Sequence, residues 1–207
     1  MSSRIERIVG ELKAFYGLLP TPPSDAFMLF VWDVLSFQAP PLKRDAAFGA
    51  LKRNPSLTPD SMEKVAPKKL EQSVALCGSY SEQRIRALKA GIHVFQRNPE
   101  LSATIRGPLA EAQEALSTLP HMGEGGADRM LLFAGDRLVF PMDAGVWRLV
   151  RRLGYDDVPD RELPETLDAY RHASMYLSHH AAATCIDKDP HCGVCPLRHD
   201  CPYGQSH

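Results

Sequence analysis

The residues with the most specific chemistry are four cysteines near the end of the chain, Cys185, Cys192, Cys195 and Cys201, which follow the spacing C-x6-C-x2-C-x5-C. Four thiolates can complete a tetrahedral zinc site or hold an iron–sulfur cluster. Structural zinc sites usually carry two Cys-x-x-Cys pairs, whereas this segment has one close pair, and bacterial ferredoxins use a tighter run. The segment is short and polar, so we expect a metal centre to order it. A pair of disulfides or a zinc knuckle stays open as the alternative.

A second feature is the stretch at 119–127, Leu-Pro-His-Met-Gly-Glu-Gly-Gly-Ala, which ends one helical segment and starts another. A helix start leaves backbone N–H donors unpaired and carries partial positive charge, so such a turn can face a phosphate. Many all-α proteins contain a similar connection, and the turn alone is weak support for any function. Asp143 follows Gly123 by 20 residues and stands where a helix N-cap belongs, which makes its carboxylate a candidate for chemistry.

The elements that must position these residues are helices almost throughout. Ser3 and Glu6 are expected to form a capping box at the first helix. Apolar residues recur at helical spacing in segments near 5–19, 25–35, 43–53, 59–76, 81–97 and 108–117, again after the turn and after Asp143, and from about 164 to 185. No segment alternates as a strand does, so we expect an all-α fold.

Composition limits the classes of protein that remain. The chain has 207 residues, 44% of them hydrophobic, and a formal net charge of −1. The charged residues near the N-terminus do not suit a signal peptide, and no apolar run approaches the ~20 residues of a membrane span. An odd count of 5 cysteines favours a reducing compartment and metal ligation, with Cys77 as a buried small hydrophobe. We therefore expect a cytoplasmic protein, nucleoid-associated if bacterial, with no membrane partner. Any surface for DNA must be a local basic patch.

Several segments together resemble the endonuclease III-like branch of the helix-hairpin-helix DNA glycosylases, from about Phe27 to Cys201. Leu-Ser-Phe-Gln-Ala at 35–39 is similar to the family segment whose glutamine enters the duplex beside the extruded base. Gly-Ser-Tyr at 78–80 looks like the family's Gly-x-Tyr turn. Leu-Pro-His-Met-Gly at 119–123 is similar to the hairpin sequence Leu-Pro-Gly-Val-Gly, and Met142-Asp143 to the Val-Asp that carries the catalytic carboxylate. The cysteine spacing is that of the family's C-terminal 4Fe-4S cluster, and His180 also has a family counterpart.

The resemblance implies a fold, a partner and a set of site residues. The fold would be two helical domains flanking a DNA groove, one at 27–137 with the hairpin and one combining 1–26 with 138–207, which holds the cluster. The partner would be double-stranded DNA with a damaged or mismatched base, bound by a monomer. Asp143 would be catalytic, and the four cysteines would hold the 4Fe-4S cluster. The expected DNA contacts are Gln38, Leu119, Pro120, His121, Met122, Gly123 and Gly125.

Departures from the family pattern modify the expected reaction. Bifunctional members continue the hairpin as Gly-Arg-Lys-Thr-Ala and use the lysine to form a Schiff base, whereas this chain has Gly125 there and no lysine between Lys89 and Lys188. We therefore expect base release by water, with weak or absent AP-lyase activity. His121 replaces the first hairpin glycine. The adenine glycosylases of the superfamily use a glutamate near the glutamine instead; Asp33 lies one residue off the expected spacing and is given no role.

Two alternatives to an enzyme stay open. The chain could be a non-catalytic binder of damaged or distorted DNA on the same fold, and an Asp143→Asn variant would then keep its function. A redox-sensing cluster protein with a secondary DNA role is the other alternative, and a change of DNA affinity with cluster oxidation state would mark it.

Overall fold

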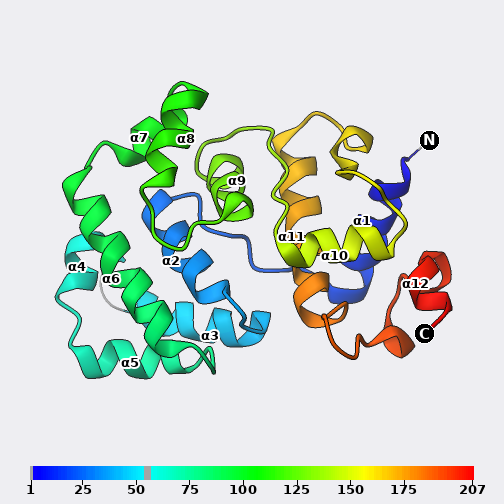
Figure 1. Ribbon diagram of the computed structural model, residues 1–207, viewed down its shortest axis with the longest axis horizontal. Coiled ribbons are helices and arrows are strands. Elements are labelled where there is room, and N and C mark those ends of the chain that lie inside the picture. The colour runs from blue at the N-terminus through cyan, green and yellow to red at the C-terminus, as the bar shows by residue number, and fades with distance from the viewer. Residues whose placement is uncertain (1, 54–56) are drawn as a thin grey trace. The chain divides into compact units, whose positions relative to one another are not determined.

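The computed structural model describes residues 2–53 and 57–207, and within these ranges it contains α-helices, short 3-10 helices and no strand (Figure 1). The expectation of an all-α fold is confirmed. The chain divides into two compact units. The hairpin unit comprises Pro22–Asp136, and the cysteine unit comprises Met1–Thr21 with Arg137–His207.

The hairpin unit is built around one apolar helix, α2 (Ala26–Ser36), which buries eight of its residues. Helix α6 (Ser81–Arg97) crosses it so closely that a Cβ on Gly91 would lie 2.1 Å from the Phe30 ring, so only glycine fits there. The remaining helices of the unit are α3 (Pro41–Lys52), α4 (Pro59–Glu63), α5 (Pro67–Ala75), α7 (Leu101–Arg106), α8 (Leu109–Ser117) and α9 (Glu124–Phe133).

Two features of the helices in this unit differ from the expectation. The single helix expected at 59–76 is two helices, because Pro67 lacks a backbone N–H and forces the preceding Ala66 into extended backbone with ψ 134°. Helix α7 was not expected, since only Leu101 and Ile105 of its six residues are buried and so short a segment shows little periodicity. Asn54 and Pro55, which separate the helices expected at 43–53 and 59–76, lie outside the described residues.

The cysteine unit packs three helices together: α1 (Arg4–Tyr16), α10 (Ala144–Arg152) and α11 (Leu167–Ala183). The expected capping box of Ser3 and Glu6 is present at the start of α1. Helix α1 ends at Tyr16 because Gly17 follows with φ 69°, so it is shorter than the apolar pattern to residue 19 indicated. Short 3-10 helices at Pro159–Glu162, Cys192–Val194 and Arg198–Asp200 and helix α12 (Pro202–Gln205) complete the unit.

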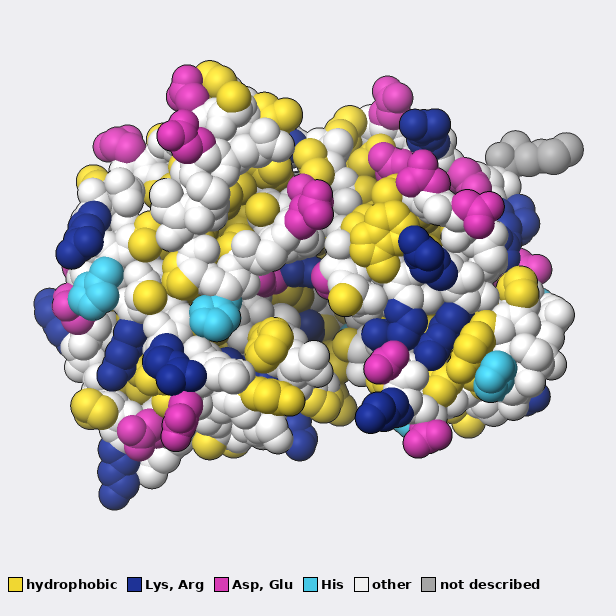
Figure 2. Space-filling view, in the orientation of Figure 1, with side chains coloured by type: hydrophobic (Ala, Val, Ile, Leu, Met, Phe, Trp, Pro, Cys, Tyr) yellow, Lys and Arg dark blue, Asp and Glu magenta, His cyan; other side chains and the backbone are white. Residues whose placement is uncertain are grey.

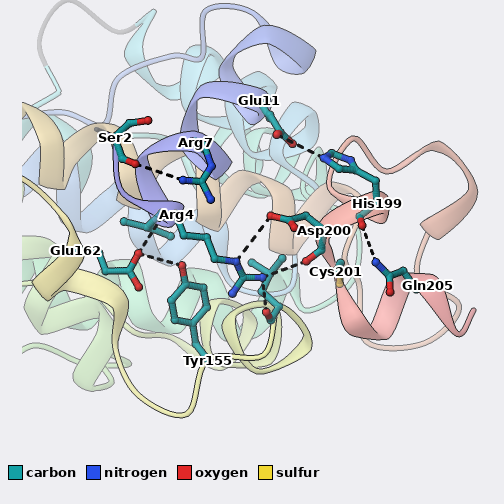
Figure 3. A network of polar contacts seen from close by, with 12 residues as sticks. Ser2, Arg4, Arg7, Glu11, Tyr155, Glu162, His199, Asp200, Cys201 and Gln205 are labelled. Atoms are coloured by element: carbon teal, nitrogen blue, oxygen red, sulfur yellow. Dashed lines mark hydrogen bonds and ion pairs between the residues drawn. The ribbon is translucent and has the colours of Figure 1, made fainter.

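A polar network fastens the N-terminal helix to the cysteine segment (Figure 3). Arg4 donates to the backbone carbonyls of Leu153 at 2.8 Å and Asp200 at 3.1 Å, and its guanidinium lies over the Tyr155 ring. The Glu162 carboxylate accepts from the Ile5 amide at 3.2 Å. These contacts fix the residue just before Cys201 to α1.

None of the helices in the described ranges is long and apolar enough to cross a membrane.

Candidate functional site

The four cysteines expected to hold a metal centre line one cavity in the cysteine unit. Cys185 follows the end of α11, Cys192 and Cys195 flank a 3-10 turn, and Cys201 caps α12. No disulfide joins these four cysteines in the structure. Leucine side chains and His180 complete the wall, and the cavity holds about 320 Å³ of space, part of it open to solvent.

Two arginines of α10 hold the segment that carries Cys185. Arg152 donates to the Ile186 carbonyl at 2.7 Å and lies 3.4 Å from the Cys185 Sγ, while its guanidinium covers the Tyr203 ring at 4.3 Å. Arg148 donates to the carbonyls of Ala181 at 2.8 Å and Cys185 at 3.0 Å. The last carbonyls of a helix lack intrahelical partners, and Arg148 satisfies that of Ala181 in the last turn of α11, while Arg152 binds the segment that follows the helix. Both side chains thus hold the cysteine segment against α10.

A hydrogen-bonded chain reaches the cavity from α1. The Tyr16 hydroxyl lies 2.6 Å from Thr184 Oγ1 and 2.7 Å from His180 Nδ1, and His180 Nε2 lies 3.5 Å from Cys195 Sγ. Burial lowers the pKa of His180 to about 4, with His179 adding to the effect, so the ring is neutral near pH 7. A neutral ring that accepts from Tyr16 at Nδ1 carries its proton on Nε2, facing Cys195.

Any metal centre in the cavity would have to bind thiols that are partly buried. Among residues 2–53 and 57–207, no three His, Cys, Asp or Glu side chains converge as the ligands of a single metal ion would. Burial raises the pKa of the Cys195 thiol to about 11 and also raises that of Cys185, against the opposing effect of Arg152. A metal centre would therefore have to displace protons from these thiols.

Asp143 is the N-cap of α10, as expected. Its Oδ1 accepts from the Gly145 amide at 2.9 Å and the Val146 amide at 3.0 Å, which fixes the orientation of a half-buried carboxylate. Gly145 stands where the family has histidine, and a Cβ there would lie 3.1 Å from Asp143 Oδ1 and 3.4 Å from the Ala181 Cβ. A side chain at 145 would therefore press on the carboxylate, while its Cβ would make an ordinary contact with α11.

The expected hairpin joins α8 to α9 in the other unit. Leu119 is buried, Pro120 and Met122 are half-buried, and the turn residues His121 and Gly123 are exposed. His121 has φ 58°, the left-handed conformation that favours glycine, which explains why the family has glycine there. Gly123 caps α9 without a side-chain hydrogen bond, and Glu124 places an acid in the first turn. Gly125 is buried and offers no side chain.

Gln38 lies just after α2, exposed, with φ 49°. The sequence did not reveal what holds it there. Arg84 of α6, only 1% exposed, donates to the backbone carbonyls of Phe37 and Ser79 and so ties the Gln38 loop to the Gly-Ser-Tyr turn. In the sequence, only its helical spacing with the apolar residues Leu88 and Ile92 of α6 indicated that Arg84 is buried.

Asp33, which was given no role, forms an ion pair with Arg129 of α9. Its carboxylate lies against the first turn of that helix, since a Cβ on Gly126 would meet Asp33 Oδ2 at 3.1 Å. The pair connects α2, which leads to Gln38, with the helix that follows the hairpin.

On the face drawn in Figure 2, Lys and Arg side chains are interspersed with Asp and Glu, as the net charge of −1 suggests.

The architecture of the chain is that of endonuclease III. A trapped covalent intermediate of endonuclease III with DNA matches with a TM-score of 0.66 and 20% identity over 98% of this chain and 96% of that one. A thermostable thymine-DNA glycosylase matches with a TM-score of 0.67 and 15% identity over 98% and 97% of the two chains. The all-α, endonuclease III-like fold class expected from the resemblance is therefore confirmed.

Sequence comparison points to the same kind of protein. A Methanocaldococcus jannaschii protein named as a DNA repair glycosylase is 26% identical over 170 residues, covering 76% of each chain. An endonuclease III of Synechocystis is 31% identical over 108 residues, which cover 48% of this chain and 49% of that protein. No protein-family model matches the sequence. The chain is thus similar in sequence to these two proteins and has the fold of endonuclease III, as its motifs indicated.

Proposed function

We propose that the protein is a DNA glycosylase of base-excision repair that hydrolyses the bond between a damaged or mismatched base and its sugar. The observation that carries the proposal is the Asp143 carboxylate, held by two backbone amides at the start of α10 in a chain with the endonuclease III fold. Relatives and structural neighbours named as glycosylases support the same reaction.

The first step is extrusion of the target nucleotide, because its glycosidic bond is inaccessible inside the base stack. Gln38 is proposed to fill the space that the nucleotide leaves, since it is exposed and its loop is held by Arg84. The hairpin residues Leu119 to Gly123, with Gly125, are proposed to contact a phosphate through the backbone at the start of α9. The Glu124 carboxylate weakens that attraction and supports only modest affinity for undamaged DNA.

The second step is cleavage, in which positive charge develops on the sugar. A fixed carboxylate stabilises that charge and can orient or deprotonate the attacking water. Asp143 is the proposed group, and its amide contacts hold it in one orientation before substrate arrives, so little reorganisation is needed. With Gly125 in place of the lysine, water is the only proposed nucleophile, and the DNA strand stays intact at the abasic product.

The cysteine cavity is the proposed site of a 4Fe-4S cluster with Cys185, Cys192, Cys195 and Cys201 as its ligands. The cluster would supply four covalent links that order the C-terminal segment, and no step of the hydrolysis uses it. Arg152 and His180 would face its ligands Cys185 and Cys195.

A panel of duplexes, each with one lesion or mismatch, tests the reaction. We expect strand breaks at one or more substrates only after alkali treatment, because the protein leaves an intact abasic site. Trapping with borohydride should give no covalent adduct, with a bifunctional endonuclease III as the positive control. A strong adduct or alkali-independent breaks would overturn the proposed use of water.

A further inference from the structure

We propose that Phe37 is a stacking side chain that enters the DNA beside Gln38 and rests on a base next to the vacated position, with Tyr80 as its support. The inference rests on the proposed function and goes beyond it, because the expected contact was Gln38 alone. It assigns a second, apolar part to the wedge.

The two rings form an exposed aromatic pair. Phe37 is 49% exposed and Tyr80 is 50% exposed, although their ring centroids lie only 5.7 Å apart in an edge-to-face arrangement at 70°. Of the other phenylalanines in the hairpin unit, Phe27, Phe30, Phe95 and Phe133 are buried and Phe48 is half-buried. An aromatic pair left in water beside a polar wedge has contact area available for a partner with a flat apolar face.

The pair stands on a rigid base. Phe37 precedes Gln38 at φ 49°, and Tyr80 itself has φ 69°, so both turns use left-handed backbone that L residues rarely adopt. The buried Arg84 guanidinium binds the carbonyls of Phe37 and Ser79, one from each turn. A side chain fixed before binding loses less conformational entropy on contact with DNA. Backbone strain of this kind persists only where the surroundings hold it, and Arg84 supplies that restraint.

The charge nearby suits a nucleic acid. The Lys43 ammonium lies 3.7 Å from where a Cβ of Gly78 would stand, so it covers the turn that carries Tyr80. A lysine at that point can meet a phosphate of the strand whose bases face Phe37. Every base presents a π-face, so aromatic stacking tolerates any sequence around a lesion. A surface that offers base stacking, a polar wedge and a phosphate contact suits a distorted DNA duplex as its partner.

The test compares binding of two labelled duplexes, one with a tetrahydrofuran abasic analogue and one intact, by fluorescence anisotropy at fixed salt. Phe37→Ala should lose about tenfold in affinity for the abasic duplex and change little for the intact one, since stacking on one base contributes roughly that factor. Phe37→Trp should keep the preference, and its indole fluorescence should be quenched when the abasic duplex binds. Leu109→Ala, at a 44% exposed leucine of α8, is the matched control and should bind both as the unchanged protein does.

The outcomes separate this inference from the proposed function. If the unchanged protein prefers the abasic duplex and Phe37→Ala keeps that preference, the stacking role is wrong while the glycosylase proposal stands. If the unchanged protein binds both duplexes alike and releases no base, the proposed function fails and this inference fails with it. Circular dichroism of Phe37→Trp and Phe37→Ala checks that each variant is folded.

Discussion

The two roles of Asp143 can be separated by two substitutions. As an N-cap, its Oδ1 accepts from the amides of Gly145 and Val146. Asparagine caps a helix about as well as aspartate, so Asp143→Asn should change the free energy of unfolding by less than about 0.5 kcal/mol. Asp143→Ala removes the cap and should cost about 1 kcal/mol, or roughly 2–4 °C in Tm for a chain of this size.

The chemical role should respond differently. Both variants lose the negative charge proposed to stabilise the sugar, so each should slow single-turnover base release by about 10²–10⁴-fold, a typical range for a lost acid–base group. The assay measures alkali-sensitive sites with enzyme in excess, on a duplex that the unchanged protein processes. Asp143→Asn that releases base within about threefold of the unchanged rate would refute the catalytic role. Asp143→Asn that unfolds as readily as Asp143→Ala would refute the capping argument.

Three further predictions follow from local chemistry. His121→Gly should raise the free energy of unfolding by about 1 kcal/mol, because the left-handed backbone at φ 58° costs an L residue roughly 1–2 kcal/mol. A lower midpoint of thermal unfolding in this variant would contradict the prediction. Tyr16→Phe should lower the free energy of unfolding, measured by denaturant titration, by about 1–2 kcal/mol, because the buried His180 loses a hydrogen bond. The control Phe15→Leu, which changes an exposed ring, should have almost no effect. Burial raises the pKa of Asp128, reinforced by Glu124 and opposed by Arg129, so the native state binds the proton more tightly than the unfolded chain. The ionised Asp128 carboxylate therefore lowers the free energy of unfolding at neutral pH, and this penalty disappears as the pH falls through the raised pKa. Asp128→Asn should therefore raise the free energy of unfolding at pH 7 and leave it unchanged at low pH. Equal gains at both pH values would contradict this explanation.

Local signals in the sequence predicted much of the fold. Ser3, Asp25 and Asp143 cap the helices that their positions indicated, because a cap depends only on residues within one turn. The cysteine spacing likewise predicted that four thiols would share one cavity. The Ala66-Pro67 break was readable in principle, since proline disfavours helical backbone at the residue before it.

Tertiary partners could not be predicted in this way. Arg148 binds the Ala181 carbonyl of α11 and Arg152 binds the Ile186 carbonyl just after that helix, and the sequence indicated neither acceptor. A sequence does not show which helix end lies opposite an arginine. Arg84 gave a partial signal, a charge in register with the buried face of α6, but its acceptors Phe37 and Ser79 lie in loops whose approach depends on packing.

The proposed cluster can be examined apart from catalysis. Protein purified without oxygen should be brown, with iron and acid-labile sulfide in a ratio near one to one, and should bind little zinc. Replacing Cys201 by serine should weaken the cluster and loosen the C-terminal segment that Arg4 holds to α1. Colourless protein with one equivalent of zinc would contradict the cluster and favour a zinc site.

The most direct test of the central claim is to count free bases and strand breaks in the same single-turnover reaction, using chromatography for the base and a denaturing gel for the strand. Water as nucleophile at Asp143 predicts one free base for each abasic site, with the strand intact until alkali is added. Strand cleavage in step with base release, or intact bases on every lesion tested with fully loaded protein, would contradict it.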